Sequence, residues 1–252
     1  MELPQAPVGS GQHPVSLVVI SANHLAASSS FYSTVFGWQI TKMSAELMAA
    51  VAPAGPAIAL RANVPAGFPG VVPYIGVSDV DAMMKRAIAA GATLERASWK
   101  IQMMGTFARF TDVSGTIYGV TNAISPTGAP HVPMPFGTNP KPPANSICSL
   151  EMFAKDEASP RFFAELFGWG TLPTMPSYVA FDAGAGIGGV FQSHTPALTA
   201  VAYIYVDDVA AKLTQIDAAG GKRLGDVMSM PGMGTFGYFT DPSETTMAMI
   251  GP

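Results

Sequence analysis

Two segments with the same hydrophobic spacing predict two helices of the same kind. Phe31-Tyr32 is followed by Phe36-Gly37-Trp38, and Phe162-Phe163 is followed in the same way by Phe167-Gly168-Trp169. Spacings of three and four residues place these aromatic side chains on one face of a helix. The glycine fits the left-handed position that ends many helices. The repetition predicts a duplicated chain in which both helices help to form the core.

The elements around these helices follow the same order in both halves of the chain. In the first half, alternating and apolar runs predict strands over 15–22, 39–43, 46–51, 57–62, 71–77, 93–100, 105–111 and 116–121. A second helix is predicted to begin at Ser78-Asp79. From position 79 onward matching residues lie 129 positions apart, so that Asp79 corresponds to Asp208. Each half repeats a strand–helix–strands unit, which predicts four βαβββ modules, two in each of two domains.

A proline-rich segment separates the two halves. Residues 125–143 contain seven prolines, and regular helices and strands do not tolerate that density. We therefore predict a first domain over 14–124, a semi-rigid linker over 125–143 and a second domain over 144–252.

Composition narrows the classes of function. The 252 residues carry a net charge of −4 and no basic run, which argues against a nucleic-acid partner. Only 12% of the residues are charged, about half the usual share, and this favours a surface that is buried in a homodimer. The longest apolar stretch is interrupted by proline and glycine and is too short to span a bilayer. Residues 1–14 lack the pattern of a signal peptide, so we expect a cytoplasmic protein without a membrane partner.

The chain has one cysteine, Cys148, and therefore no intrachain disulfide. Its apolar, strand-like neighbours are typical of a buried and unreactive thiol.

Three motifs carry a resemblance to a known superfamily. They are Phe-Tyr-x-x-x-Phe-Gly-Trp from Phe31, Val-x-Asp-Val-Asp before a helix that ends in Ala-Ala-Gly-Ala, and Gly-x-Phe-x-x-x-x-Asp-x-x-Gly from Gly105. Together they resemble the vicinal oxygen chelate superfamily, which includes glyoxalase I, bleomycin-resistance proteins and extradiol dioxygenases. The sequence looks most like the two-domain, tandem glyoxalase-like bacterial proteins. The resemblance implies an α+β fold of two tandem glyoxalase-like domains, each with two βαβββ modules that form a curved, half-open mixed sheet around a cavity.

The resemblance also implies a divalent metal, held by a histidine in the first strand of a module and a glutamate near the end of the last strand. The matching histidine positions hold Ser16, Val72, Ser149 and Val201, and the matching glutamate positions hold Gly119 and Ala248. The four histidines lie elsewhere, at His13, His24, His131 and His194, and are predicted to have surface or capping roles. We therefore predict no metal ligand and no cofactor.

Without the metal, the second domain offers one polar set of residues for a function. Alternate strand positions point to one face, which places Ser149, Glu151, Tyr203, Tyr205 and Tyr238 along the predicted cavity. Glu151 is a carboxylate in the middle of an apolar strand and would need a partner such as a tyrosine hydroxyl. We predict Glu151 and Tyr203 as catalytic residues, and Ser149, Tyr205 and Tyr238 as ligand contacts. The alternative is that Glu151 is a satisfied polar group at the rim of the sheet.

The first domain is predicted to have a less polar cavity, because Val18 stands at the position that matches Glu151. The candidate ligand contacts there are Tyr74, Trp99, Arg109 and Tyr118. Arg109 could meet an anionic ligand, and the alternative is a surface ion pair with Asp or Glu. Methionines such as Met83-Met84 and Met103-Met104 could line an adaptable pocket or fill the core.

These observations leave three functions open. The first is a metal-independent binder of a small apolar or aromatic molecule, as the bleomycin-resistance branch implies. The second is an enzyme that uses Glu151 and a tyrosine as acid and base on a natural-product-like substrate. The third is a metal-dependent lyase, isomerase or dioxygenase with non-standard ligands.

Overall fold

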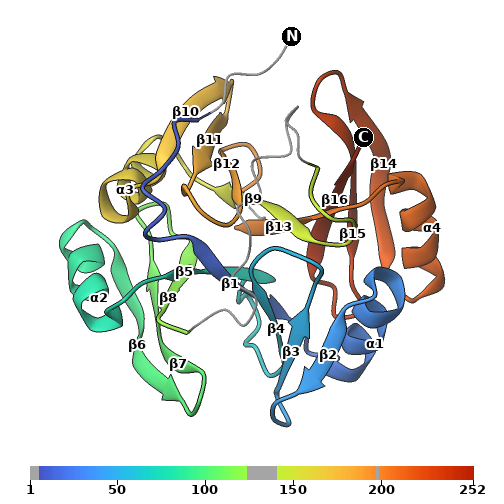
Figure 1. Cartoon of the computed structure of the whole chain (residues 1–252), viewed down its shortest axis with the longest axis horizontal. Helices are drawn as coiled ribbons and strands as arrows, with labels where there is room; N and C mark the ends of the chain where they lie inside the picture. The colour runs from blue at the N-terminus through green and yellow to red at the C-terminus, as the bar shows by residue number, and fades with distance from the viewer. Residues whose placement is uncertain (1–5, 124–140, 197–198) are drawn as a thin grey trace.

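The structure, a computed structural model, describes residues 6–123, 141–196 and 199–252. In these residues the chain forms two eight-stranded mixed sheets, each accompanied by two helices (Figure 1). The first half contains β1 (Val15–Ser21), α1 (Leu25–Phe36), β2 (Gln39–Lys42), β3 (Leu47–Val51), β4 (Ala57–Arg61), β5 (Val71–Gly76), α2 (Val80–Ala89), β6 (Thr93–Ile101), β7 (Gly105–Thr111) and β8 (Ile117–Thr121). The second half contains β9 (Ile147–Phe153), α3 (Ala158–Phe167), β10 (Gly170–Met175), β11 (Tyr178–Asp182), β12 (Gly188–Gln192), β13 (Ala200–Tyr205), α4 (Val209–Ala218), β14 (Lys222–Met230), β15 (Gly234–Thr240) and β16 (Thr246–Gly251).

Both sheets have the same strand order. The first runs β2-β3-β4-β1-β5-β8-β7-β6, and the second runs β10-β11-β12-β9-β13-β16-β15-β14. In each sheet the first strands of two modules pair antiparallel, β1 with β5 and β9 with β13. The other central pairs, such as β1 with β4 and β5 with β8, are parallel. The predicted α+β fold with two βαβββ modules in each half is therefore confirmed.

The predicted linker over 125–143 lies almost entirely outside the described residues. The boundaries of the two predicted domains, 14–124 and 144–252, therefore stay a prediction.

The repeated aromatic motif ends each helix as expected. Gly37 and Gly168 adopt left-handed conformations, with φ of 69° and 71°, at the ends of α1 and α3. The tryptophans that follow turn back onto the core. Trp38 stacks on Tyr32 with ring centroids 4.8 Å apart, and Trp169 stacks on Phe181 at 4.6 Å. The motif thus serves the core, as its spacing predicts.

Each aromatic helix also packs against the other half of the chain. The ring of Phe31 lies 6.0 Å from that of Phe239 on β15, and Phe163 lies 4.8 Å from Tyr118 on β8. In Figure 1, α1 lies beside α4 on one side of the molecule and α3 lies near α2 on the other. The two halves therefore share a single hydrophobic core.

Reciprocal hydrogen bonds join the halves at the helix ends. The indole nitrogen of Trp38 donates to the carbonyl of Asn145, just before β9, and that of Trp169 donates to the carbonyl of His13, just before β1, each at 2.8 Å. The side chain of Arg86 donates to a carbonyl at the end of α3, and that of Lys212 donates to one at the end of α1. These cations meet carbonyls that have no partner within their own helix.

Two matching aspartates add a buried polar contact between the halves. The carboxylate of Asp112 accepts a hydrogen bond from the hydroxyl of Ser159 at 2.6 Å, and that of Asp241 accepts one from Ser28 at 2.8 Å. Each carboxylate also accepts hydrogen bonds from backbone N–H groups of its own turn. Burial raises the pKa of both carboxyls above the usual value, and the hydrogen bonds oppose this rise.

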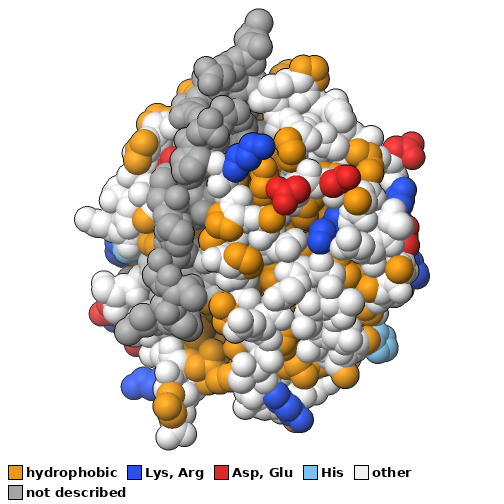
Figure 2. Space-filling model, turned by 45° about the vertical axis from the view of Figure 1, so that its right-hand side comes forward, with side chains coloured by type: hydrophobic (Ala, Val, Ile, Leu, Met, Phe, Trp, Pro, Cys, Tyr) orange, Lys and Arg blue, Asp and Glu red, His pale blue; other side chains and the backbone are white. Residues whose placement is uncertain are grey.

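The surface carries few charges, as the composition predicts. Figure 2 shows one face on which few Lys, Arg, Asp and Glu side chains lie among many hydrophobic and neutral groups. Cys148 is fully buried, and burial raises the pKa of its thiol, which fits the predicted unreactive role.

In the described part of the chain, the helices are too short or too polar to cross a bilayer. The predicted homodimer stays a prediction.

Candidate functional site

Side chains of the central strands alternate between two faces of each sheet. In β1, Val18 and Ile20 join the core beneath the helices, whereas Leu17 and Val19 form a separate cluster with Tyr74 on the other face. We call this second face, which is turned away from the helices, the open face. The candidate sites of both halves lie on the open faces.

On the second sheet, a carboxylate and two phenols meet on the open face. The hydroxyl of Tyr203 on β13 donates to Oε2 of Glu151 on β9 at 2.6 Å. The hydroxyl oxygens of Tyr203 and Tyr238 lie 2.5 Å apart, and Tyr238 also donates to Glu151 Oε2 at 3.4 Å. Glu151 is 5% exposed. Its buried charge therefore has the hydroxyl partners that the sequence predicts.

The strand order explains how the two tyrosines meet. Tyr203 and Tyr238 lie on β13 and β15, and both pair with Ala248 of the intervening β16. Because alanine is small, the two rings approach each other above it, with centroids 6.0 Å apart. Burial, followed by the charge of Glu151, raises the pKa of both tyrosines. Both phenols therefore stay protonated at neutral pH and act as hydrogen-bond donors.

The other predicted residues of the second half lie near this cluster. Ser149 is buried and pairs with Tyr203 across the strands, two residues before Glu151 on the same face. Tyr205 is also buried, and its backbone pairs with Ser146 near the start of β9. The structure thus brings Glu151, Tyr203 and Tyr238 into direct contact, whereas no described hydrogen bond joins Tyr205 to them.

Tyr178 is a further member of this region that the sequence did not indicate. Burial, followed by the charge of Glu151, raises its pKa to about 12, and its hydroxyl lies 3.3 Å from Nε2 of His194. The corresponding position in the first half is Leu47, since Tyr178 pairs with Gln192 as Leu47 pairs with Arg61. The internal repeat therefore gave no signal for a polar residue at this position.

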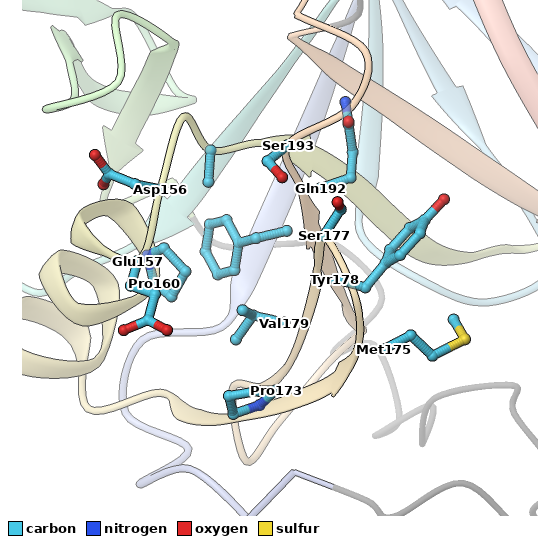
Figure 3. Close-up of a pocket in the computed structure, with 12 residues that line it drawn as sticks. Asp156, Glu157, Pro160, Pro173, Met175, Ser177, Tyr178, Val179, Gln192 and Ser193 are labelled. Carbon is cyan, nitrogen blue, oxygen red and sulfur yellow. The ribbon is translucent and has the colours of Figure 1, made fainter.

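Tyr178 also borders a cavity of about 240 Å³ (Figure 3). Figure 3 shows Glu157 and Pro160 at the start of α3 on one side of this cavity, and Val179 of β11 on the other. Gln192, Ser177 and Ser193 close its upper end in this view. This cavity is less than half as large as the one that borders the first sheet.

The first sheet borders a cavity of about 540 Å³. Its wall is mostly apolar and includes Leu17, Met43, Leu47, Met48, Ala49, Ala57, Ala59, Met103, Met104 and Phe107, with Ser16 and Asn122 as polar members. Both alternatives for the methionines occur: Met103 and Met104 line this pocket, whereas Met83 and Met84 are buried in the core.

The strand register corrects one match between the halves. Leu17 pairs with Tyr74 as Ser149 pairs with Tyr203. The residue that corresponds to Glu151 is therefore Val19, and the predicted match with Val18 is wrong by one position. The first open face is nevertheless apolar at this position, as expected.

Arg109, Tyr74 and Trp99 do come together on the first open face. Arg109 forms a two-bond ion pair with Glu95, with nitrogen–oxygen distances of 2.6 and 3.2 Å. The guanidinium of Arg109 lies 5.5 Å from the ring of Trp99. The pKa of Tyr74 is raised, mainly by burial. Arg109 itself is 5% exposed whereas Glu95 is exposed, so the predicted ion pair exists and runs from the buried face to the surface.

Two parts of the first site differ from the prediction. Tyr118 points to the helix side and packs on Phe163, because its neighbour Gly119 occupies the open face beside Tyr74. The prediction of Tyr118 as a ligand contact is wrong.

Phe68 lies between Arg61 and Arg109, at 5.7 and 4.9 Å from the two guanidiniums. It was missed because the prolines and glycines around it predict a break in regular structure.

The open faces do not fit the metal that the resemblance implies. The register moves the first of the predicted positions from Ser16 to Leu17, because Leu17 pairs with Tyr74 as Ser149 pairs with Tyr203. The positions then hold Leu17, Val72, Ser149, Val201, Gly119 and Ala248, none of which offers an imidazole or a carboxylate. A side chain at Gly119 would collide with the ring of Tyr74, which covers this position. Within residues 6–123, 141–196 and 199–252, no three His, Cys, Asp or Glu side chains are grouped to hold a metal ion.

Two sheets built from paired βαβββ modules, with cavities beside them, define the class of glyoxalase-type folds. No protein-family model matches the chain. CFP32 of Mycobacterium tuberculosis, which is provisionally named a glyoxylase, is 24% identical over 250 residues, or 90% of both chains. A glyoxylase-like domain-containing protein of Didymella fabae is 32% identical over 119 residues, which are 41% of this chain and 91% of that protein. The chain belongs to the glyoxylase-like proteins of the vicinal oxygen chelate superfamily.

Solved structures agree on the fold. The Mn(II)-bound glyoxalase of Novosphingobium aromaticivorans has a TM-score of 0.63 at 14% identity, with 97% of this chain and 83% of that chain covered. The 2,3-dioxygenase LapB of Pseudomonas sp. KL28 has a TM-score of 0.65 at 12% identity, with 97% and 93% covered. At this identity the likeness shows the shared fold alone.

Proposed function

We propose that this protein binds a small apolar or aromatic molecule in the cavity beside the first sheet, without a bound metal. The observation that carries this proposal is the cavity of about 540 Å³ with its mostly apolar wall. Binding pockets for small molecules typically have volumes of about 300–1,000 Å³ and combine apolar walls with a few polar groups. Ser16 and Asn122 supply such polar groups here.

The donor chemistry of the open faces supports the metal-free part of the proposal. The glyoxalase of similar fold is described as Mn(II)-bound. In this chain, apolar side chains, Ser149 and Gly119 stand at the positions where the superfamily would hold its metal. Aliphatic side chains cannot ligate a divalent cation, and a serine hydroxyl is a weak ligand for it.

Filling the cavity tests the proposal. Ala49 on β3 is half-buried and lines the cavity, so Ala49→Phe would place a ring inside it. The neutral fluorescent probe N-phenyl-1-naphthylamine is expected to bind the wild-type protein. The variant should raise its Kd at least about tenfold, which corresponds to about 1.4 kcal/mol. Fluorescence titration measures both constants, and dialysis against EDTA should leave the wild-type value unchanged.

Ala210→Phe is the matched control, because Ala210 is exposed on α4, far from the cavity in sequence and in the fold. It should bind the probe as the wild type does. Equal affinity of Ala49→Phe and the wild type would contradict binding in this cavity. Loss of binding after EDTA treatment, restored by a divalent metal, would contradict the metal-free part.

A second candidate function rests on the hydrogen bonds between Glu151, Tyr203 and Tyr238. A carboxylate that faces two protonated phenols could accept a proton from a substrate while a phenol donates one. We propose Glu151 as the base and Tyr203 as the acid of such a reaction. Ser149 and Tyr205 would line the same face.

Glu151→Gln tests this second function, because glutamine keeps an acceptor oxygen for Tyr203 but cannot take up a proton. Any turnover that wild-type protein shows in a screen of aromatic carbonyl compounds should fall about 10²–10⁴-fold. The melting temperature should change little, which circular dichroism would verify. Full turnover in Glu151→Gln would exclude the role of Glu151 as a base.

A further inference from the structure

We propose that Arg61, Arg96 and Arg109 form an anion-binding subsite beside the cavity of the first sheet. The ligand would then be an apolar or aromatic acid, with its body in the cavity and its carboxylate or other anionic group at the arginines. This inference deepens the proposed function and rests on it for the apolar part of the ligand.

The three arginines reach one place from three strands. Arg61 ends β4, Arg96 lies on β6 and Arg109 lies on β7. The guanidiniums of Arg61 and Arg109 both lie near the ring of Phe68, at 5.7 and 4.9 Å. Those of Arg96 and Arg109 both lie near the ring of Trp99, at 4.0 and 5.5 Å. Two aromatic rings thus hold three cations close together.

The three arginines carry more positive charge than the described carboxylates beside them neutralise. Glu95 pairs with Arg109, and this is the only ion pair that any of the three arginines makes with another described residue. The group therefore has a net charge of +2 in a chain whose net charge is −4. It also holds half of the six arginines of the chain. Burial, and then repulsion by Arg109, lowers the pKa of Arg61, so that an anion placed here would relieve an existing repulsion.

The arginines continue the wall of the cavity. Ala57 and Ala59 line the cavity, and Arg61 is the next residue of β4 on the same face. On the other side Phe107 lines the cavity and contacts both Trp99 and Tyr74, with ring centroids 5.8 and 6.0 Å apart. A ligand body against Phe107 would therefore have its end near the guanidiniums. Arginine suits this role because its planar donors match a carboxylate in pairs.

The second half lacks this group. Gln192 corresponds to Arg61, and Tyr238 corresponds to Arg109. The second open face carries the carboxylate of Glu151 instead. The two open faces therefore have opposite charge, and the anion subsite belongs to the first half.

A pair of fluorescent probes tests the subsite. 1-Anilinonaphthalene-8-sulfonate carries a sulfonate on the ring system of the neutral N-phenyl-1-naphthylamine. In Arg61→Met/Arg96→Met, the Kd of the sulfonate probe should rise at least tenfold, whereas that of the neutral probe should stay within twofold. Arg109 is left in place because it is buried and already paired with Glu95, so that its removal could disturb the fold. Raising NaCl should weaken sulfonate binding to the wild type and have little effect on the double variant.

Lys85→Met/Lys100→Met is the control, since it removes two exposed charges outside the group and should leave both constants unchanged. An unchanged sulfonate Kd in the arginine variant, or an equal loss for both probes, would overturn the subsite. Absence of neutral-probe binding in the wild type would instead reject the cavity function, so the two failures are distinguishable. Circular dichroism verifies that both variants are folded.

Discussion

Phe163→Ala is expected to lower the free energy of unfolding by about 3–5 kcal/mol, because it removes a large aromatic ring from a closed core. Phe163 is 0% exposed. Its ring lies 4.8 Å from Tyr118 of the other half and 5.0 Å from Trp169 of its own half. The cavity left by the ring would therefore open at the contact between the halves. Urea denaturation followed by tryptophan fluorescence measures the loss.

A double-mutant cycle with Tyr118→Ala shows how much of this loss belongs to the contact between the halves. The two changes should couple by about 0.5–1.5 kcal/mol, as aromatic pairs in proteins do. A single cooperative transition is expected for wild type and variants, because the halves share one core. A loss of unfolding free energy below about 1.5 kcal/mol in Phe163→Ala would contradict the first expectation. Additive effects of the two changes would show that the contact between Phe163 and Tyr118 does not stabilise the protein.

Asp241→Ala is expected to cost about 2–4 kcal/mol, because it leaves two buried donors and one half-buried donor without their acceptor. The carboxylate of Asp241 accepts hydrogen bonds from the backbone of Ser243 and Thr245 and from the hydroxyl of Ser28. Since Ser28 belongs to α1, the change also loosens the contact between the halves. Asp241→Asn is the control, because its amide oxygen can still accept from the turn, and it should cost much less. Urea denaturation at pH 7 compares the variants.

The raised pKa of Asp241 predicts the sign of a pH effect. Burial places its native pKa above the usual value of 3.8. A group with a raised native pKa favours the folded state while it is protonated, and this contribution is lost as the pH rises through the native pKa. The stability of the wild type relative to Asp241→Asn should therefore fall between about pH 4 and neutral pH. A relative stability that rises over this range would contradict the assignment.

Much of the fold could be predicted from the sequence, because its strongest signals are local. The Phe-Gly-Trp motif predicts a helix, its end and its repetition, and the constant offset from Asp79 onward predicts the second half. Strand alternation was sufficient to place Glu151, Tyr203 and Tyr238 on one face of the sheet, since one face of a strand follows directly from its period.

The remaining features depend on tertiary structure. The match of Glu151 with Val18 was wrong because β1 is apolar on both faces, so that only its pairing with β5 fixes the register. Phe68 lies in a proline- and glycine-rich connection, and its position between two arginines follows from the fold of that connection. The volume of a cavity depends on strand curvature and packing, for which the pattern of residues gives no measure.

The reciprocal contacts between the halves have the form of an isologous interface. Trp38 bonds to the start of the second half as Trp169 bonds to the start of the first, and Asp112 and Asp241 repeat one contact in both directions. In a symmetric pair of identical subunits every substitution appears twice, so that both sites must change together. Here the two copies are encoded separately within one chain. This separation lets the first half carry a group of arginines and the second half a buried carboxylate while the contacts between the halves keep their symmetry.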